Sequence, residues 1–249
     1  MCAGHAVGKG VTGLLSAVLL FSAARATGPD PDKPVAASTS RWEEGQPGCT
    51  FSRDDDGKYR YGFWNADYGV VLAVDSQELE KVRRRAQPIF ALLLTVHYRG
   101  EHSLNVTPSQ ASLEFVKHYH DVHGALDPDN LASKQQKDAD TLAEEIQHAI
   151  RKHPEKQAEK EAVLEADRKD AAEMIEFLNT RSLRAMTLDS GHPETSGWVL
   201  FSTHSKWIDH LQKQEEFVLR VPLGNRVVEF PFSLPPSEGD LILRNRPEK

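Results

Sequence analysis

"EEFVLRVPLGNRVVEFPF", residues 215–232, predicts a β-hairpin down to single residue pairs, and the rest of the expected fold is built around it. Gly224 and Asn225 suit a two-residue type II′ turn, which takes glycine first and joins two antiparallel strands. That turn fixes the register of the strands on either side of it. Leu223 is predicted opposite Arg226, next to the turn. The pairs that follow on the core face are Val221 with Val228, Leu219 with Phe230 and Phe217 with Phe232, and Arg220 pairs with Glu229 on the other face.

Two prolines in this hairpin constrain what lies beside it. Pro222 and Pro231 fall at positions whose backbone donors point away from the hairpin in the predicted register. Proline cannot donate a hydrogen bond to a neighbouring strand and therefore occurs at sheet edges or bulges. We expect at least one of the two strands to be an edge strand or a bulged strand.

Several upstream segments share the β pattern. In "KYRYGFW", residues 58–64, aromatic residues alternate with Lys, Arg and Gly, as a half-buried strand requires. "IFALLLTVHY", residues 89–98, is apolar on both faces at its start, which is typical of a strand central to the core. Further strands are expected in residues 68–75, in residues 103–119 with a break at Pro108, and in residues 196–207, and a short helix is expected in residues 76–86.

Residues 127–180 differ in composition, being rich in Glu, Lys, Gln and Ala. Asp127 suits a helix N-cap and Pro128 a first helical residue, where the missing donor of proline costs nothing. Pro154 interrupts the amphipathic pattern, because proline inside a helix removes a hydrogen bond and clashes with the preceding turn. A second helix is expected from about Glu155 to Leu178. Because the flanking strands must join one core, a hairpin of two antiparallel helices is favoured over one straight or kinked helix.

The stretch "TLDSGHPETSGWVLFST", residues 187–203, followed by the closing hairpin, resembles the end of an immunoglobulin-like sandwich domain of bacterial exported proteins. In such domains a Gly-Trp-Val-x-Phe motif opens one of the last strands. The resemblance covers residues 58–116 and 183–243, and it implies a binding or structural role. The chain lacks the paired core cysteines of antibody domains. The expected fold is therefore mainly β with a large α insertion: an immunoglobulin-like antiparallel β-sandwich carrying a long helical hairpin.

The N-terminus has the pattern of a secretory signal peptide. Lys9 precedes an apolar run, and Ala24-Arg25-Ala26 matches the A-x-A cleavage pattern. The alternative is an uncleaved membrane anchor, although Gly and Ser residues interrupt an apolar run that is already short for one. We expect export to the periplasm or the medium, with no membrane span after cleavage. The expected organisation is a signal peptide at residues 1–26, a flexible linker rich in Pro, Asp, Ser and Gly at 27–47, the first part of the sandwich at 48–126, the helical insertion at 127–180, and the last strands with a C-terminal tail at 181–249.

Charge and cysteine content exclude some classes of function. The formal net charge of the whole chain is −7, and it becomes −9 without residues 1–26, which hold Lys9 and Arg25 but no acidic residue. An acidic chain argues against a nucleic-acid partner, because phosphate binding relies on clustered Lys and Arg. Cys49 is the one cysteine of the expected mature chain, so the fold must rest on its core rather than on a disulfide.

"KHYHDVH", residues 117–123, is the cluster most suggestive of chemistry. His118 and His120 would share one face of a strand, a spacing that binds zinc or copper, with His123 or Asp121 as a third ligand. The alternative is a polar strand exit with solvated imidazoles. The sequence contains no P-loop, G-x-S-x-G or G-x-G-x-x-G motif, so we assign no catalytic residue and expect no cofactor other than zinc at these histidines.

These observations lead to three hypotheses of function. The first is an exported, non-enzymatic binding or assembly module whose helical insertion contacts a protein partner, because the apolar stripes of the insertion are narrow and its other faces are charged. The second is a metal-binding protein or metal-dependent enzyme that uses His118, His120 and His123. The third makes the insertion a coiled coil through which copies of the chain oligomerise.

Overall fold

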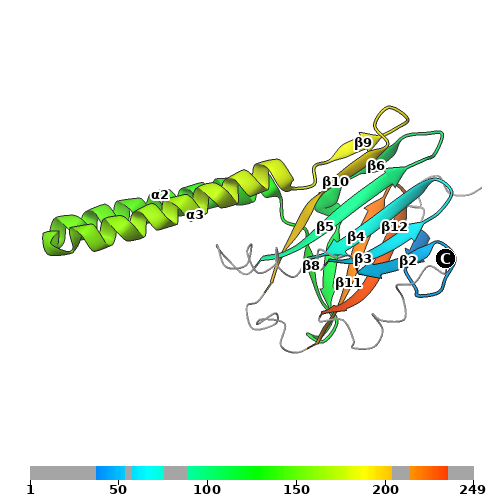
Figure 1. The fold of residues 1–249 in the computed structure, drawn as a ribbon, viewed down its shortest axis with the longest axis horizontal. Coiled ribbons are helices and arrows are strands. Elements are labelled where there is room, and N and C mark those ends of the chain that lie inside the picture. Colours follow the sequence, from blue (N-terminus) through cyan, green and yellow to red (C-terminus); the bar gives the residue numbers. More distant parts are fainter. Residues whose placement is uncertain (1–37, 54–57, 76–88, 204–213, 235–249) are drawn as a thin grey trace, which may run out of the picture. The chain divides into compact units, whose positions relative to one another are not determined.

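The computed structural model of the chain describes residues 38–53, 58–75, 89–203 and 214–234. In these residues the fold is mainly β, with two sheets and two long helices (Figure 1). The expected signal peptide, the first part of the expected linker, the short helix expected at residues 76–86 and the C-terminal tail from residue 235 onward lie outside the described residues.

The first sheet has five antiparallel strands. In spatial order they are β10 (Glu194–Ser202), β5 (Ile89–Tyr98), β4 (Tyr68–Val74), β3 (Tyr59–Trp64) and β2 (Cys49–Arg53). β5 pairs with a neighbour on each side and most of its residues are buried, so the prediction of a central strand is confirmed.

The second sheet has seven strands. Its main path runs β1 (Ser38–Arg41), β12 (Arg226–Leu234), β11 (Glu215–Leu223), β6 (Leu104–Val106) and β9 (Met186–Leu188), while β7 (Ser112–Phe115) pairs with β11 and β8 (Asp121–Gly124) pairs with β7. β1 runs parallel to β12, and the other pairings in this sheet are antiparallel. A single 3₁₀ turn, Pro108–Gln110, separates β6 from β7, as the break expected at Pro108 required.

The predicted hairpin is formed by β11 and β12, and its register is confirmed at every predicted pair, from Leu223 with Arg226 to Phe217 with Phe232. Gly224 has a φ of +59°, which the first position of a type II′ turn requires. The local turn chemistry therefore sets the alignment of both strands.

The two prolines of the hairpin lie where a neighbouring strand is missing. Pro222 falls between Arg220, the last β11 residue paired with β7, and Leu223, which pairs with β6. Pro231 lies beyond Glu229, the last β12 residue paired with β1. Among the described residues, neither proline meets a ladder partner on its outer side. The expectation that β11 or β12 is an edge strand is wrong, because β12 lies between β1 and β11, and β11 lies between β12 and the strands β6 and β7. The prolines are accommodated instead where the pairing with these outer strands stops.

The two sheets pack against each other through aromatic side chains. The Phe90 ring of β5 stacks on the Phe217 ring of β11 with 5.0 Å between centroids, and Phe217 also stacks on Phe232 at 5.1 Å. Tyr61 of β3 meets Phe232 at 6.0 Å. Each large apolar side chain buried in this way contributes roughly 1.5–3 kcal/mol. The core therefore lies between the sheets.

Part of the expected flexible linker is ordered, which corrects the prediction for residues 38–47. β1 lies within that range, and Trp42 directly after it is buried. The indole Nε1 of Trp42 donates to the carbonyl oxygen of Thr50 at 3.0 Å, and its ring meets Tyr61 edge-on at 5.1 Å. The polar composition of the segment predicted disorder, but one tryptophan and the backbone partners on β12 suffice to hold it.

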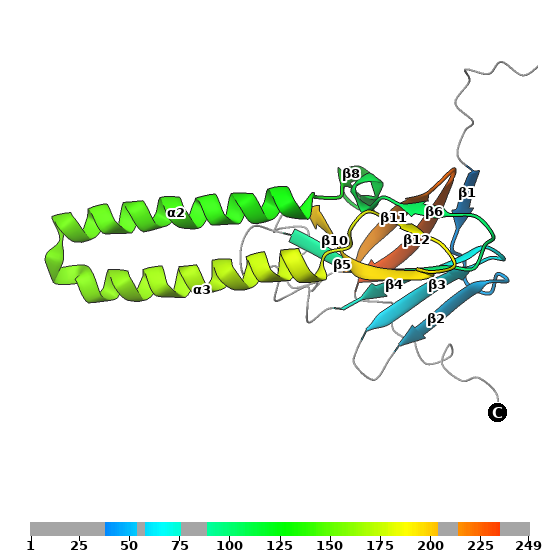
Figure 2. The same cartoon turned by 90° about the horizontal axis from the view of Figure 1, so that it is seen from above.

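The helical insertion consists of α2 (Pro128–Lys152), a 3₁₀ turn (Pro154–Lys156) and α3 (Gln157–Arg181). Asp127 is the N-cap of α2, and its Oδ1 accepts hydrogen bonds from the amides of Asp129 and Asn130 at 2.8 and 3.1 Å. The two helices run antiparallel and lie side by side (Figure 1, Figure 2). The hairpin arrangement is therefore found, with its reversal at His153-Pro154 as predicted.

Candidate functional site

The predicted histidine cluster lies in a turn rather than on a strand. β7 ends at Phe115 and β8 begins at Asp121, and the two residues Tyr119 and His120 have φ values of 58° and 57°. The amide of Asp121 donates to the carbonyl oxygen of His118 at 3.1 Å and closes the turn. The expectation that His118 and His120 share a strand face is wrong, because two consecutive left-handed residues reverse the chain.

Each of the three imidazoles contacts a different carboxylate. The contacts are His118 Nε2 with Glu215 Oε2 at 3.2 Å, His120 Nδ1 with Glu114 Oε1 at 2.5 Å, and His123 Nε2 with Asp121 Oδ2 at 3.0 Å, while His123 Nδ1 also meets the Ser202 hydroxyl at 2.9 Å. Within the described ranges, no three His, Cys, Asp or Glu side chains form a group that could hold a metal ion. The zinc site stays a prediction.

A row of charged side chains crosses the outer face of the seven-stranded sheet. Arg220 of β11 bridges Glu229 of β12, at 2.9 Å from Nε to Oε1, and Glu114 of β7. Glu229 in turn accepts from Arg41 of β1 at 3.1 Å, and Glu114 meets His120. The predicted Arg220–Glu229 pair is thus the centre of a network that ties four strands together.

The network shifts the pKa of its central groups. Burial alone would raise the pKa of Glu114, but the hydrogen bonds and charges of His120 and Arg220 outweigh it and lower that pKa below its ordinary value. Burial alone would lower the pKa of Arg220, but its bonds to Glu114 and Glu229 raise it overall. The buried carboxylate is therefore charged at neutral pH and stabilises the sheet.

Both ends of the helical insertion are bonded to the edge of β10. The amide of Leu126, just before α2, donates to the carbonyl oxygen of Leu200 at 2.7 Å, and the amide of Leu183, just after α3, donates to that of Trp198 at 2.9 Å. A Cβ atom on Gly197 would lie only 2.5 Å from the Leu183 nitrogen. The glycine of the Gly-Trp-Val-x-Phe motif therefore allows the chain to approach the strand.

The base of the hairpin belongs to the β core. Its buried residues, Leu131 and Ala132 of α2 with Met174 and Leu178 of α3, join the same hydrophobic cluster as the strands. Phe177 of α3 also lies 6.0 Å from Trp198 of β10, measured between ring centroids. The first and last turns of the insertion are thus part of the folded core.

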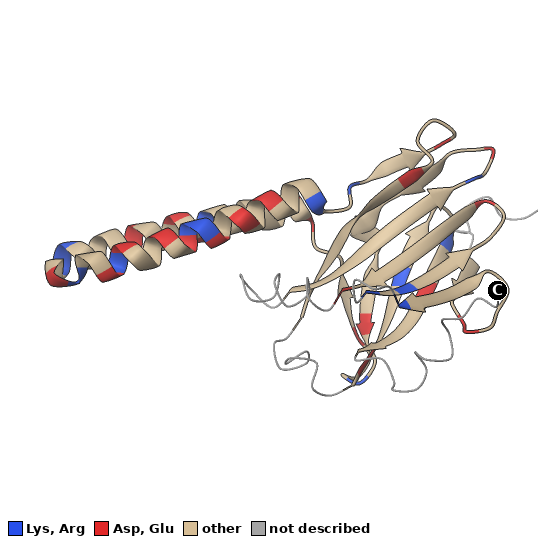
Figure 3. Cartoon of the chain, viewed as in Figure 1, with Lys and Arg blue, Asp and Glu red and all other residues tan. Residues whose placement is uncertain are grey.

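The distal hairpin, residues 139–171, has a different environment. Ala139, Ile146 and Leu164 are buried, yet they do not belong to the core shared with the strands. The outer faces of the two helices carry Lys, Arg, Asp and Glu of both signs in alternation (Figure 3). Val163 is 52% exposed, and its helical neighbours Ala162 and Ala166 are also exposed. The distal hairpin therefore buries only its own seam and presents a small apolar patch among charges.

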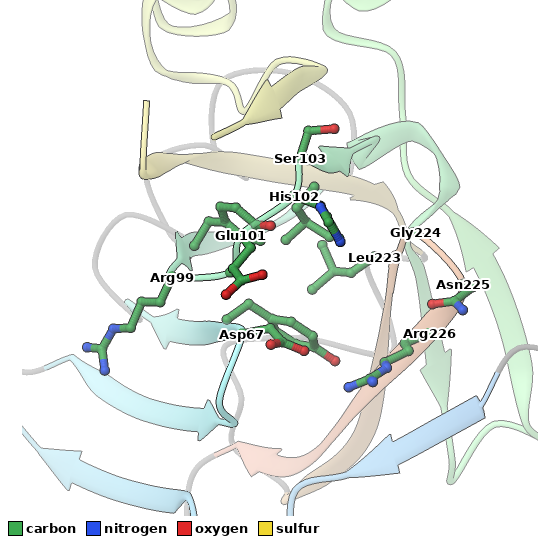
Figure 4. A pocket seen from close by; sticks show the side chains of 13 residues that line it. Asp67, Arg99, Glu101, His102, Ser103, Leu223, Gly224, Asn225 and Arg226 are labelled. Carbon is green, nitrogen blue, oxygen red and sulfur yellow. The ribbon is translucent and has the colours of Figure 1, made fainter. Parts of the chain in front are cut away.

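A cleft of about 620 Å³ opens between three connections of the two sheets (Figure 4). The connections are the β3–β4 turn with Asp67, the β5–β6 segment from residue 99 to residue 103, and the β11–β12 turn around Gly224. Tyr68, Tyr98, Leu104 and Leu223 line it where these connections enter strands.

The charged groups of the cleft are of both signs. The carboxylates of Asp67 and Glu101 point into the opening, Arg226 approaches it from the β12 side, and Arg99 points away (Figure 4). The Arg99 guanidinium lies instead over the Trp64 ring, 5.1 Å from its centroid. No pattern in the sequence predicts this cleft, because its residues come from three turns far apart along the chain and match no motif.

Comparisons of the chain with protein families, with curated proteins and with solved structures find no match. Among the described helices, none combines the length and apolar character needed to cross a membrane.

Proposed function

We propose that this protein is an exported, non-enzymatic binding or assembly module, in which an immunoglobulin-like β-sandwich presents the helical hairpin to a protein partner. The immunoglobulin-like assignment rests on the sequence resemblance at residues 187–203 and is supported by two packed sheets rich in antiparallel strands. Export rests on the signal-peptide pattern of residues 1–26.

The distal hairpin carries the proposal. Ordering a residue of the chain costs roughly 1–2 kcal/mol in backbone entropy, and residues 139–171 contribute no side chain to the core of the strands. A narrow seam is enough to pair two helices with each other but leaves their outer faces to solvent. A long element that the sandwich core does not use is best explained by a contact outside the chain.

The exposed apolar patch indicates where the contact lies. Ala162, Val163 and Ala166 are neighbours on one face of α3, because residues three and four apart meet on a helix surface. Small residues ringed by charges of both signs suit the side of another helix, which would pack on Val163 and pair its charges around the rim. We therefore assign the partner as a protein that offers a helix to this face.

Photo-crosslinking tests the assignment. A photoreactive residue is placed at Val163 and, as a matched control, at Ala172, which is also exposed on α3 but lies half a turn away around the helix axis. We expect one heterologous adduct of defined mass at position 163 in cells that export the protein, and none at position 172. An adduct of twice the chain's own mass would favour oligomerisation instead, and equal adducts at both positions would contradict a specific face.

A further inference from the structure

The cleft between the three connections has the dimensions of a ligand site and is separate from the helical hairpin. Its volume of about 620 Å³ lies within the range of roughly 300–1,000 Å³ that small-molecule sites occupy. The wall on the side of the five-stranded sheet is held in place by hydrogen bonds from backbone amides: Asn65 Oδ1 accepts from the amides of Asp67 and Tyr68 at 2.9 and 2.8 Å, and the Arg99 amide donates to the Asp67 carbonyl oxygen at 2.7 Å. This wall is therefore defined before any ligand arrives.

One lining residue carries a polar group without a partner. Tyr68 is only 3% exposed, and its hydroxyl is buried with no hydrogen bond among the described residues. Buried hydroxyls normally have a partner, and one that lacks it deserves an explanation. A polar ligand that enters the cleft, with a small shift of the lining, would supply that partner.

The charges around the opening are unpaired. Neither Asp67, Glu101 nor Arg226 makes a side-chain ion pair within the described part of the chain. The carboxylates of Asp67 and Glu101 point into one opening, and the Arg226 guanidinium stands on the β12 side (Figure 4). A ligand with one positive and one negative end would satisfy both walls at once.

The floor of the cleft is apolar. Leu104 and Leu223 are 9% and 1% exposed and contribute to the lining between the charged walls. Gly100 lies so close to the Tyr98 side chain that a Cβ atom at position 100 would be only 2.6 Å from the Tyr98 hydroxyl. Glycine at position 100 therefore allows the β5–β6 segment to pass close to the Tyr98 side chain.

From this arrangement we propose that the cleft binds a small zwitterionic ligand of the dipeptide class. Asp67 and Glu101 hold the ammonium group, Arg226 holds the carboxylate, and an aliphatic side chain lies on Leu104 and Leu223. The bond of Arg226 to a carboxylate is charge-assisted on both sides and therefore specific as well as strong.

Calorimetric titration of the full chain with leucyl-leucine tests the proposal. We expect saturable binding of the free dipeptide and a loss of affinity of about tenfold or more when either its amino group is acetylated or its carboxyl group is amidated. No heat of binding up to about 10 mM dipeptide, or equal affinity for the blocked and free forms, would overturn the proposal.

Substitutions then test which wall of the cleft binds which end of the dipeptide. Arg226→Gln should weaken binding of the free dipeptide but leave the affinity for the amidated form unchanged. The double substitution Asp67→Asn, Glu101→Gln should also weaken binding of the free dipeptide but leave the affinity for the acetylated form unchanged. Ser103→Ala, also at the rim, is the matched control and should bind as the wild type does. A thermal melt of each variant separates loss of binding from loss of folding, and crosslinking at Val163 is independent of all these outcomes.

Discussion

The amide nitrogen of Leu183 lies 2.9 Å from the carbonyl oxygen of Trp198, and this bond fixes the chain that leaves α3 to the edge of β10. With the matching bond from Leu126 to Leu200, it covers an edge that would otherwise present free backbone groups. The helical insertion therefore protects the five-stranded sheet at the same point at which it is anchored.

Gly197→Ala should destabilise the protein by roughly 1–3 kcal/mol, because the added methyl group meets the Leu183 backbone, which cannot rotate away as a side chain can. Urea unfolding measures the change. Gly124→Ala is the control, since a Cβ atom there has no neighbour within 4 Å, and it should cost little. Equal effects at the two sites would contradict the close approach.

Gly224→Val should destabilise by about 1 kcal/mol or more, because it forces a β-branched residue into a positive φ. Asn225→Gly, at the second position of the same turn, should be nearly neutral. Thermal unfolding of the two variants compares them directly, and similar small shifts for both would mean that the turn tolerates a side chain at its first position.

Replacing residues 140–170 by a short Gly-Ser linker should leave the two β-sheets folded. Ala139 and Ala171 lie at similar distances from the turn at residues 153–156, so the linker can close the shortened pair of helices. Circular dichroism should show less helix, with a cooperative transition kept. By contrast, Leu178→Ala should cost about 2–5 kcal/mol, because that side chain is fully buried in the shared core. Unfolding of the shortened chain would show that the distal hairpin supports the core.

Acid should weaken the network around Glu114. Its pKa is lowered in the folded protein, so the stabilisation is fully present above the ordinary pKa of about 4.5 and is lost as the pH falls through the folded pKa. The free energy of unfolding of the wild type should therefore fall more steeply below about pH 4.5 than that of Glu114→Gln. Parallel pH profiles for the two proteins would rule out this contribution.

The chain recovered from the exported fraction should begin at Thr27, after Ala24-Arg25-Ala26. N-terminal sequencing of that fraction reads the residue directly. Recovery of Met1 in a membrane fraction would instead favour the uncleaved anchor.

What the sequence predicted correctly is local. The type II′ turn at Gly224 sets the register of β11 and β12, and the Asp127 cap with the proline after it sets the start of α2. What it missed depends on distant partners: β1 is ordered by β12, and the cleft joins three separate turns. The left-handed pair Tyr119 and His120 was also missed, because neither is a glycine or asparagine, the residues that usually signal that conformation.

The parallel pairing of β1 with β12 has a consequence for how the chain folds. The ion pair between Arg41 and Glu229 joins residues 188 positions apart, so β1 is synthesised early while its partner comes among the last strands. A parallel neighbour cannot form by a simple hairpin, and pairings of such high contact order slow folding. We expect β1 to stay unpaired during synthesis and to dock last, so that a nascent chain stalled before residue 226 keeps Trp42 accessible to solvent until β12 emerges.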